Sequence, residues 1–449
     1  MTQASGSNPR TIGRSRLLRC TALGLVLAAL EVLPVRAAPA GANIPAGVTA
    51  PPTITTTGPV TDVKVNQART LIDWSSFDIA KGEAVNFRFN AGSDIVLNRV
   101  LGQAVVDGTL NGLVGAKAGG NVWIYGGQGV VFGPNARVNV GSLMATSTPL
   151  SSVSDFLSGS NAFTFQGGAT DASVLVRSGA RLTSQGALAL IAPSVATEAG
   201  AQVTAGGTLL YGSAQNFRIH FGESAGGNLD LLDFEVPASA LQDGSVSATP
   251  LTIGGDTAGD RVMFATVSRP SVMNAVISLG GLVTAKGAVA GEGGDIILSA
   301  TGAPASVLVG GALQADRSVS MTADGGRIEA SGAVTARDAS GQGGAITLGD
   351  GATAAVTLDS GARLDVASTG AGQTGGRAAL TGQAVNVQGT IEASGPAGGG
   401  AILVGGGFHG QDQTIANADQ VTVGPGALLK ADATVAGDGG AAVLWSQNA

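Results

Sequence analysis

Two five-residue segments decide the fold: Gly179-Ala180-Arg181-Leu182-Thr183 and, 21 residues later, Gly200-Ala201-Gln202-Val203-Thr204. Each begins with glycine, which allows a turn to adopt a positive φ that other residues avoid. Each continues with alternating apolar and polar residues, the pattern of a strand that is buried on one face. Because the same strand pattern returns after about 20 residues, the segments indicate a solenoid in which every repeat supplies one coil.

The repeat continues through the second half of the chain. Further copies of the first segment are Gly281-Leu282-Val283-Thr284-Ala285, Gly332-Ala333-Val334-Thr335-Ala336 and Gly361-Ala362-Arg363-Leu364-Asp365. A second marker, Gly-Gly-x followed by apolar residues, begins at Gly293, Gly343, Gly399 and Gly439. Its spacings of 50, 56 and 40 residues correspond to about two coils each. The periodicity therefore predicts an all-β fold, a β-solenoid.

The composition agrees with such a core and excludes disorder. Among 449 residues there are 72 glycines, 44% hydrophobic residues and only 12% charged residues, whereas a disordered chain needs low hydrophobicity and high charge. Aromatic residues make up only 4% of the chain. We therefore expect coils of two or three short strands with an interior of Val, Ile, Leu and Ala, where large rings fit poorly. Only the two end coils should expose strand edges.

The N-terminus has the pattern of an export signal. A basic region precedes the apolar stretch from Cys20 to Leu30, and small residues suitable for cleavage follow near Ala37 and Ala40. The alternative is a buried N-terminal helix. Removal of residues 1–37 would lower the formal net charge from −7 to −11 and take away the single cysteine. Because binding to phosphates needs Lys and Arg, such an acidic chain is not expected to bind nucleic acid. No mature transmembrane span is expected either.

Two regions differ from the regular repeat. From Thr61 to Thr146 the chain is richer in large apolar residues, and the segment from Ala84 to Phe89 alternates like a strand. Residues 221–270 are more acidic and contain fewer regularly spaced glycines, so we expect an excursion from the solenoid, a hairpin or loop that packs on its side. The chain ends within a repeat pattern, which predicts either a short passenger or a part of something longer.

Four blocks between Leu71 and Thr146 carry a family resemblance. They span Ile72 to Ile79, Val96 to Gly102, Gly120 to Ile124 and Gly129 to Gly141. Their order and spacing resemble the N-terminal secretion domain of the filamentous haemagglutinin family, which is exported by two-partner secretion. Many members carry Asn-Pro-Asn-Gly where this chain has Gly126-Gly127-Gln128-Gly129, so only the last residue is kept. This departure concerns the turn geometry and the specificity for the partner.

The resemblance implies a right-handed parallel β-helix and a route of export. In this family, periplasmic domains of an outer-membrane barrel transporter recognise the N-terminal domain, and the rest follows through the barrel unfolded. The implied domains are a signal peptide at 1–37, a two-partner secretion domain at 38–270 and a β-helix repeat extension at 271–449. The implied product is an adhesin-like exoprotein, secreted or surface-exposed, with a glycan or protein on a host or cell surface as its ligand.

The resemblance also selects residues of a secretion motif. These are Trp74, Phe77, Leu97, Asn98, Arg99, Trp123, Gly129, Phe132 and Gly133. We expect the four aromatic residues to act by burial, as core or capping residues, rather than by direct contact with the transporter. Asn98 is expected to bond along a turn between coils. Arg99 is expected to pair with Asp73, Asp78 or Asp94, or to face the transporter.

The sequence offers little for catalysis, and no catalytic, cofactor or metal residues are predicted. The only histidines are His220 and His409, and His220 lies in an alternating, strand-like run. Polysaccharide-active β-helices use clustered carboxylates, and the nearest approach is Asp230, Asp233 and Glu235, which we interpret as a solvated acidic loop. The alternative function is a β-helical polysaccharide-active enzyme. Isolated Gly-Gly-Asp triplets are not in tandem and do not predict calcium sites.

Overall fold

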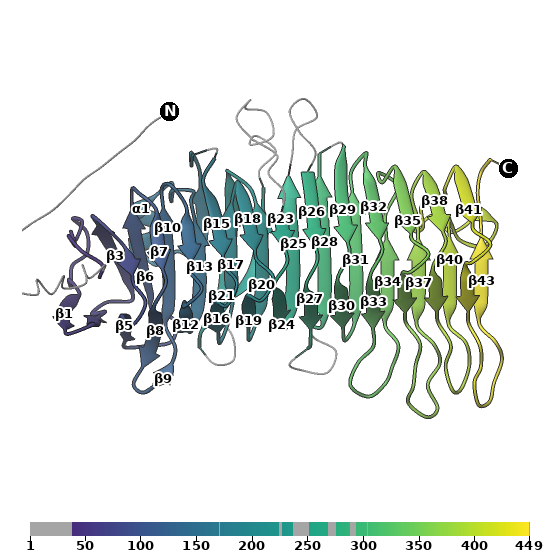
Figure 1. Cartoon of the computed structure of the whole chain (residues 1–449), viewed down its shortest axis with the longest axis horizontal. Coiled ribbons are helices and arrows are strands. Elements are labelled where there is room, and N and C mark those ends of the chain that lie inside the picture. Colours follow the sequence, from purple (N-terminus) through teal and green to yellow (C-terminus); the bar gives the residue numbers. More distant parts are fainter. Residues whose placement is uncertain are drawn as a thin grey trace, which may run out of the picture. The chain divides into compact units, whose positions relative to one another are not determined.

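The computed structural model describes residues 38–169, 171–223, 227–236, 251–267, 275–287, 293–302 and 304–448. The predicted signal peptide at 1–37 lies outside these residues. Residues Ala37–Ala449 group together as one unit, and its described part is a right-handed parallel β-helix (Figure 1). This agrees with the solenoid that the repeats predicted and with the β-helix that the family resemblance implied. Among the described residues, no helix is long and apolar enough to cross a membrane.

Each complete coil contributes one strand to each of three sheets. In the described residues, sheet 1 contains β1 (Thr53–Thr57), β2 (Val60–Lys64), β5 (Ala84–Phe89), β8 (Thr109–Val114), β9 (Lys117–Ala118), β12 (Arg137–Val140), β16 (Arg181–Ser184), β19 (Gln202–Ala205), β24 (Asp256–Gly259), β27 (Leu282–Ala285), β30 (Ala312–Ala315), β33 (Ala333–Ala336), β36 (Arg363–Asp365), β39 (Thr390–Glu392) and β42 (Leu428–Lys430).

Sheet 2 follows sheet 1 in each coil. Its described strands are β3 (Arg69–Trp74), β6 (Ile95–Val100), β10 (Asn121–Gly126), β13 (Ser142–Thr146), β17 (Leu188–Ala192), β20 (Thr208–Ser213), β25 (Arg261–Val267), β28 (Asp295–Thr301), β31 (Ser318–Ala323), β34 (Ala345–Leu348), β37 (Arg377–Leu380), β40 (Ala401–Val404) and β43 (Ala441–Leu444).

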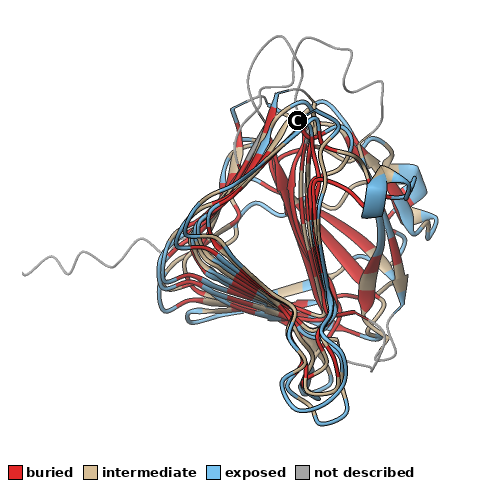
Figure 2. Cartoon of the chain, turned by 90° about the vertical axis from the view of Figure 1, so that its right-hand side faces the viewer, coloured by how far each residue is buried: buried red, intermediate tan, exposed pale blue. Residues whose placement is uncertain are grey.

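Sheet 3 completes each coil. Its described strands are β4 (Asp78–Ile79), β7 (Ala104–Val106), β11 (Val130–Phe132), β15 (Ser173–Val176), β18 (Ser194–Thr197), β23 (Leu251–Ile253), β26 (Ala275–Leu279), β29 (Ala305–Val309), β32 (Arg327–Ala330), β35 (Ala355–Leu358), β38 (Ala384–Val387) and β41 (Gln420–Val423). Figure 2 shows the three sheets as the sides of a triangle that encloses the buried core.

Parallel pairing stacks equivalent residues of successive coils. The two segments that predicted the fold become β16 and β19, and Leu182 lies opposite Val203 in their register. Both side chains are at most 1% exposed. Each coil thereby repeats the inward positions of the coil before it, so that the apolar interior is continuous along the helix.

The interior accepts large rings, so the prediction that they fit poorly is wrong for the first half of the helix. Phe77, Phe87 and Phe132 are fully buried in the core between the sheets. Further along, Tyr211 lies opposite Phe264 in the register, and their rings stack with centroids 5.3 Å apart. Rings at equivalent positions of neighbouring coils can stack in parallel, and such pairs gain more than the burial of their area alone.

The first coil is covered at its exposed edges. Strand β1 turns back and pairs antiparallel with β2, while isolated bridges join Ala40 to Ser76 and Asn43 to Asp73. Ile54 of β1 packs against the helix core. These elements shield the open end of the core from water, as a solenoid requires at its termini.

The expected excursion exists but has different limits. A side sheet is formed by β14 (Ala162–Phe165), β21 (Phe217–Glu223) and β22 (Leu229–Glu235), all antiparallel, with the short helix α1 (Val153–Leu157) preceding it. Residues 251–267, which we assigned to the excursion, instead return to the coils as β23, β24 and β25. A 3-10 helix, η2 (Phe408–Gly410), lies in a later loop.

Candidate functional site

Three of the four motif aromatics lie inside the β-helix. Trp74 at the end of β3 is 5% exposed, and Phe77 and Phe132 are fully buried. Trp74 contacts Phe77 with ring centroids 5.8 Å apart. The expectation that these residues act by burial agrees with their positions in the core.

Asn98 lies in the middle of strand β6, not in a turn, so that part of the prediction is wrong. It stands in register between Ile72 and Ile124 and is 1% exposed. Its Oδ1 accepts a hydrogen bond of 3.0 Å from Trp74 Nε1, and its Nδ2 donates one of 3.2 Å to the Trp123 carbonyl oxygen. A buried amide is tolerated here because both ends of the amide are hydrogen-bonded.

Arg99 makes one of the pairs that the sequence suggested. Its Nε and Nη2 donate to the two carboxylate oxygens of Asp73, at 2.7 and 3.0 Å. Asp73, Arg99 and Tyr125 are register neighbours on the outer side of sheet 2. Burial raises the pKa of Tyr125, and the positive charge of Arg99 offsets part of that shift. The bidentate geometry links neighbouring coils on this outer side of the sheet.

The other two large motif residues face outwards from sheet 2 and form a second core. Leu97 and Trp123 are register neighbours and are at most 1% exposed. The Trp123 ring lies among aromatic rings of α1 and the side sheet, with centroid distances of 5.7 Å to Phe156, 4.8 Å to Phe163 and 5.4 Å to Phe221. Trp123 therefore holds the side sheet onto the coils, which the sequence did not predict.

The motif glycines are required by close approach. Gly129 has a φ of +109°, and a Cβ there would lie 2.6 Å from the backbone oxygen of Ser173 in the next coil. A Cβ on Gly133 would overlap the carboxylate of Asp107. Residues 126–129, which stand where many members carry Asn-Pro-Asn-Gly, form a tight turn. In this turn Gly129 N donates a hydrogen bond of 2.9 Å to the carbonyl oxygen of Gly126.

Hydrogen bonds from residues of the coils hold the side sheet against the β-helix. The Leu229 carbonyl accepts from Ser142 Oγ at 2.5 Å and from Ala187 N at 2.9 Å. Asp230 Oδ1 accepts a hydrogen bond of 2.8 Å from Thr208 N, at the start of strand β20. Asp230 is therefore a structural acceptor and not the member of a solvated loop that we expected.

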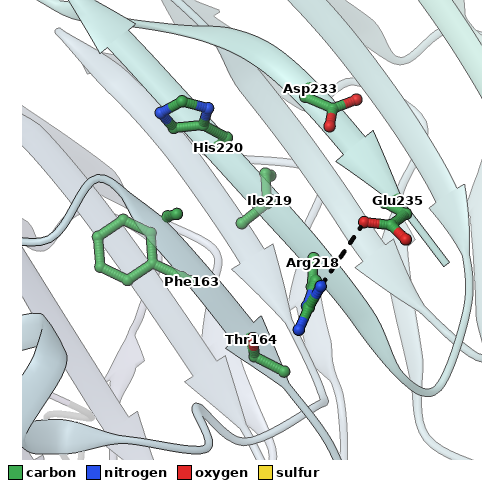
Figure 3. Close-up of a pocket in the computed structure, with 8 residues that line it drawn as sticks. Phe163, Thr164, Arg218, Ile219, His220, Asp233 and Glu235 are labelled. Atoms are coloured by element: carbon green, nitrogen blue, oxygen red, sulfur yellow. Dashed lines mark ion pairs between the residues drawn. The ribbon is translucent and has the colours of Figure 1, made fainter. Parts of the chain in front are cut away.

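The outer face of the side sheet carries the remaining candidates. His220 lies opposite Asp233, and Arg218 lies opposite Glu235, across β21 and β22. All four side chains are exposed around an open hollow of about 330 Å³ (Figure 3). His409, the other histidine, lies far along the chain in η2, at a φ of +54°. No group of three His, Cys, Asp or Glu residues able to hold a metal occurs in the part of the chain that the structure describes.

The sequence did carry a signal for the second core. Strand β17 (Leu188–Ala192) and residues Val122 to Ile124 of β10 are apolar without interruption, and both faces are buried. A continuous apolar strand indicates cover on both sides. Nothing comparable marks β14, whose alternation matches that of an ordinary coil strand.

The structure therefore falls in the class of capped parallel β-helices, with a buried motif that supports a side sheet. A model of the TPS (two-partner secretion) secretion domain family matches residues 46–303, more than half of the chain. The chain belongs to this family.

Two relatives match part of the chain. Two proteins of Haemophilus influenzae named heme/hemopexin-binding protein are 30% identical over 122 residues and 33% identical over 88 residues. These matches cover 27% and 19% of this chain but only 12% and 9% of the relatives, so the chain spans about a tenth of their length.

Two solved secretion domains are also similar. The crystal structure of the HMW1 secretion domain from Haemophilus influenzae has a TM-score of 0.66 and 20% identity, covering 89% of this chain and 100% of that chain. The filamentous hemagglutinin secretion domain has a TM-score of 0.36 and 12% identity, covering 83% and 97%. The first of these likenesses supports the β-helical fold.

Family membership places the chain among exoproteins of the two-partner secretion type. It implies export out of the cell and an outer-membrane transporter as the partner. The TPS secretion domain family is not a family of enzymes.

Proposed function

We propose that the chain is an adhesin-like exoprotein that leaves the cell through an outer-membrane barrel with periplasmic transport-associated domains. Residues 1–37 act as the signal peptide, 38–270 as the secretion domain and folding nucleus, and 271–449 as a β-helix extension. The product is displayed on the cell surface or released. It works by recognition and folding rather than by catalysis.

The family match over residues 46–303 is the observation that carries the export route. The contact between the motif blocks supports the order of recognition and folding. Trp74, Asn98 and Trp123 come from three successive coils. Two buried hydrogen bonds connect them through the side chain of Asn98. Because these residues are at most 5% exposed, a transporter can contact them only before the domain folds. We infer that the unfolded motif is recognised first and that the same residues then nucleate the fold outside the cell.

The topology suits this order of events. Parallel pairing joins residues more than 20 positions apart, and such non-local contacts form slowly. Once the first coils exist, each further coil adds to its neighbour. Folding on the outer side therefore draws the chain outwards and opposes its return.

Export is tested by producing the full chain, signal included, with and without its cognate barrel. We expect surface or medium levels to depend on the barrel. Equal levels in both strains contradict the proposal. Adhesion is tested separately by comparing the attachment to host cells of bacteria that carry the barrel with or without this chain; equal attachment contradicts the adhesive role and leaves the export route standing.

A further inference from the structure

The outer face of the side sheet presents an ordered set of polar side chains. Two rows run across the three strands: His220 and Asp233 beside the small Ala162, then Thr164, Arg218 and Glu235. They surround the hollow of about 330 Å³ that Figure 3 shows. This volume is at the small end of the range for ligand sites.

These groups have hydrogen-bonding capacity that the fold does not use. Among the described residues, neither the His220 ring nor the Asp233 carboxylate nor the Thr164 hydroxyl has a hydrogen-bond partner. Arg218 and Glu235 approach only to 4.0 Å, and their side chains are 63% and 56% exposed. Asp230 on the same strand is different, because backbone donors hold it.

The sheet does not need this polar face for its stability. Its other face carries Phe163, Ile219 and Phe221, each at most 3% exposed, in the core around Trp123. Exposed ion pairs at this separation contribute little to folding. The identity of the outer residues is therefore free to serve recognition.

The charges select the kind of ligand. Arg218 is a donor, Asp233 and Glu235 are acceptors, and His220 and Thr164 can do both. An anion would meet two carboxylates, and a cation would meet a guanidinium. Neither of these like-charge repulsions opposes a neutral ligand. The hydroxyl groups of a sugar are neutral and offer donors and acceptors together.

We propose that this face binds the end of a neutral glycan. His220 and Asp233 bind one part of the sugar, and Arg218, Glu235 and Thr164 bind the other. The inference rests on the proposed function in one respect, because it requires the folded face to lie outside the cell. It assigns no reaction to the site.

The test is an array of immobilised neutral oligosaccharides of glucose, galactose, mannose and N-acetylhexosamines, probed with the purified full-length chain. Acidic and basic oligosaccharides are included on the same array. The variants are His220→Ala and Asp233→Ala, each with an exposed residue of the same type elsewhere as its control, His409→Ala and Asp419→Ala. Circular dichroism and the urea midpoint check that all variants are folded.

We expect retention on at least one neutral glycan, at least fivefold weaker for His220→Ala and Asp233→Ala and unchanged for the two controls. The absence of any neutral ligand overturns the proposal. So does equal retention by folded His220→Ala, or retention on charged glycans alone. The assay needs no transporter, so its failure leaves the export route standing, and a failed export experiment leaves a measured binding site standing.

Discussion

Trp74 and Asn98 are joined by a hydrogen bond of 3.0 Å inside the β-helix, from the indole Nε1 to the amide Oδ1. The Nδ2 of Asn98 in turn donates a hydrogen bond to the backbone carbonyl oxygen of Trp123. The buried side-chain amide of Asn98 thus connects Trp74 and Trp123, which come from two other motif blocks. These three residues of the proposed secretion motif therefore specify a folded arrangement, in which each of them is at most 5% exposed.

Replacement of Asn98 should destabilise the domain more than its size suggests. Asn98→Ala leaves the buried Trp74 N–H without its acceptor, which costs about 1–3 kcal/mol, and removes packed atoms as well. Asn111 provides the control, because it donates to Asn86 on the partly exposed outer side of sheet 1. We expect Asn111→Ala to cost about 1 kcal/mol or less. Equal urea midpoints for the two variants would contradict this role for Asn98.

Trp123→Ala should loosen the side sheet. A fully buried tryptophan surrounded by rings contributes about 3–5 kcal/mol against alanine. Limited proteolysis below the unfolding midpoint should then cut first within residues 153–165 and 217–236. Phe408→Ala is the matched control because Phe408 is 70% exposed, and its effect should stay within about 0.5 kcal/mol. Unchanged protease resistance of Trp123→Ala would show that the side sheet does not depend on this ring.

The turn glycines should differ sharply in their tolerance of alanine. Gly129→Ala combines a positive φ with a contact of 2.6 Å to a backbone oxygen, and we expect a loss of about 1–3 kcal/mol or more. Gly102 has no atom within 4 Å of its virtual Cβ, so Gly102→Ala should be near neutral. The urea midpoints of the two variants measure this difference; a neutral Gly129→Ala would refute it.

Asp365 should make stability depend on acid pH. Burial raises the pKa of Asp365, but hydrogen bonds from Ala367 N and from Arg337 and Arg363 outweigh it, so that the pKa is lowered overall. Because the folded pKa is below the unfolded value of about 3.9, the stabilisation is present above that pH and disappears as the pH falls through the folded pKa. Asp365→Asn should therefore unfold at lower urea than wild type at pH 7, and the difference should vanish in strong acid. A difference that is constant with pH would contradict the ion-pair account.

The chain should release no reducing ends from polysaccharides. Asp230 is occupied by backbone donors, and Asp233 lies on the exposed face. A screen of neutral and acidic polysaccharides measures this directly. Activity that disappears in Asp230→Ala and Asp233→Ala would establish the enzymatic alternative instead.

The sequence was sufficient for the coils because their determinants are local. Glycine at a turn and alternation over four residues identify each strand, and equal spacing then stacks Leu182 on Val203. The burial of Trp74 and Phe132 followed from their size. The pairing of Arg99 remained one of several possibilities, since the sequence offered three candidate carboxylates and only the register places Asp73 beside Arg99.

The side sheet was predicted only in part, because its partners are distant in sequence. Strand β14 pairs with β21 more than 50 residues later, and both alternate as coil strands do. Local pattern therefore cannot separate them from the helix. The position of Asn98 was predicted wrongly for a related reason. Asparagine usually occurs in turns, and only its two buried hydrogen-bond partners stabilise it within a strand.

The most direct test of two-partner export compares two strains that produce the full chain. One carries the intact cognate barrel, and the other carries the same barrel without its periplasmic domains. We predict that the chain reaches the surface or medium only in the first strain, and that in the second it is degraded or retained in the periplasm. Equal amounts outside both strains would contradict the account.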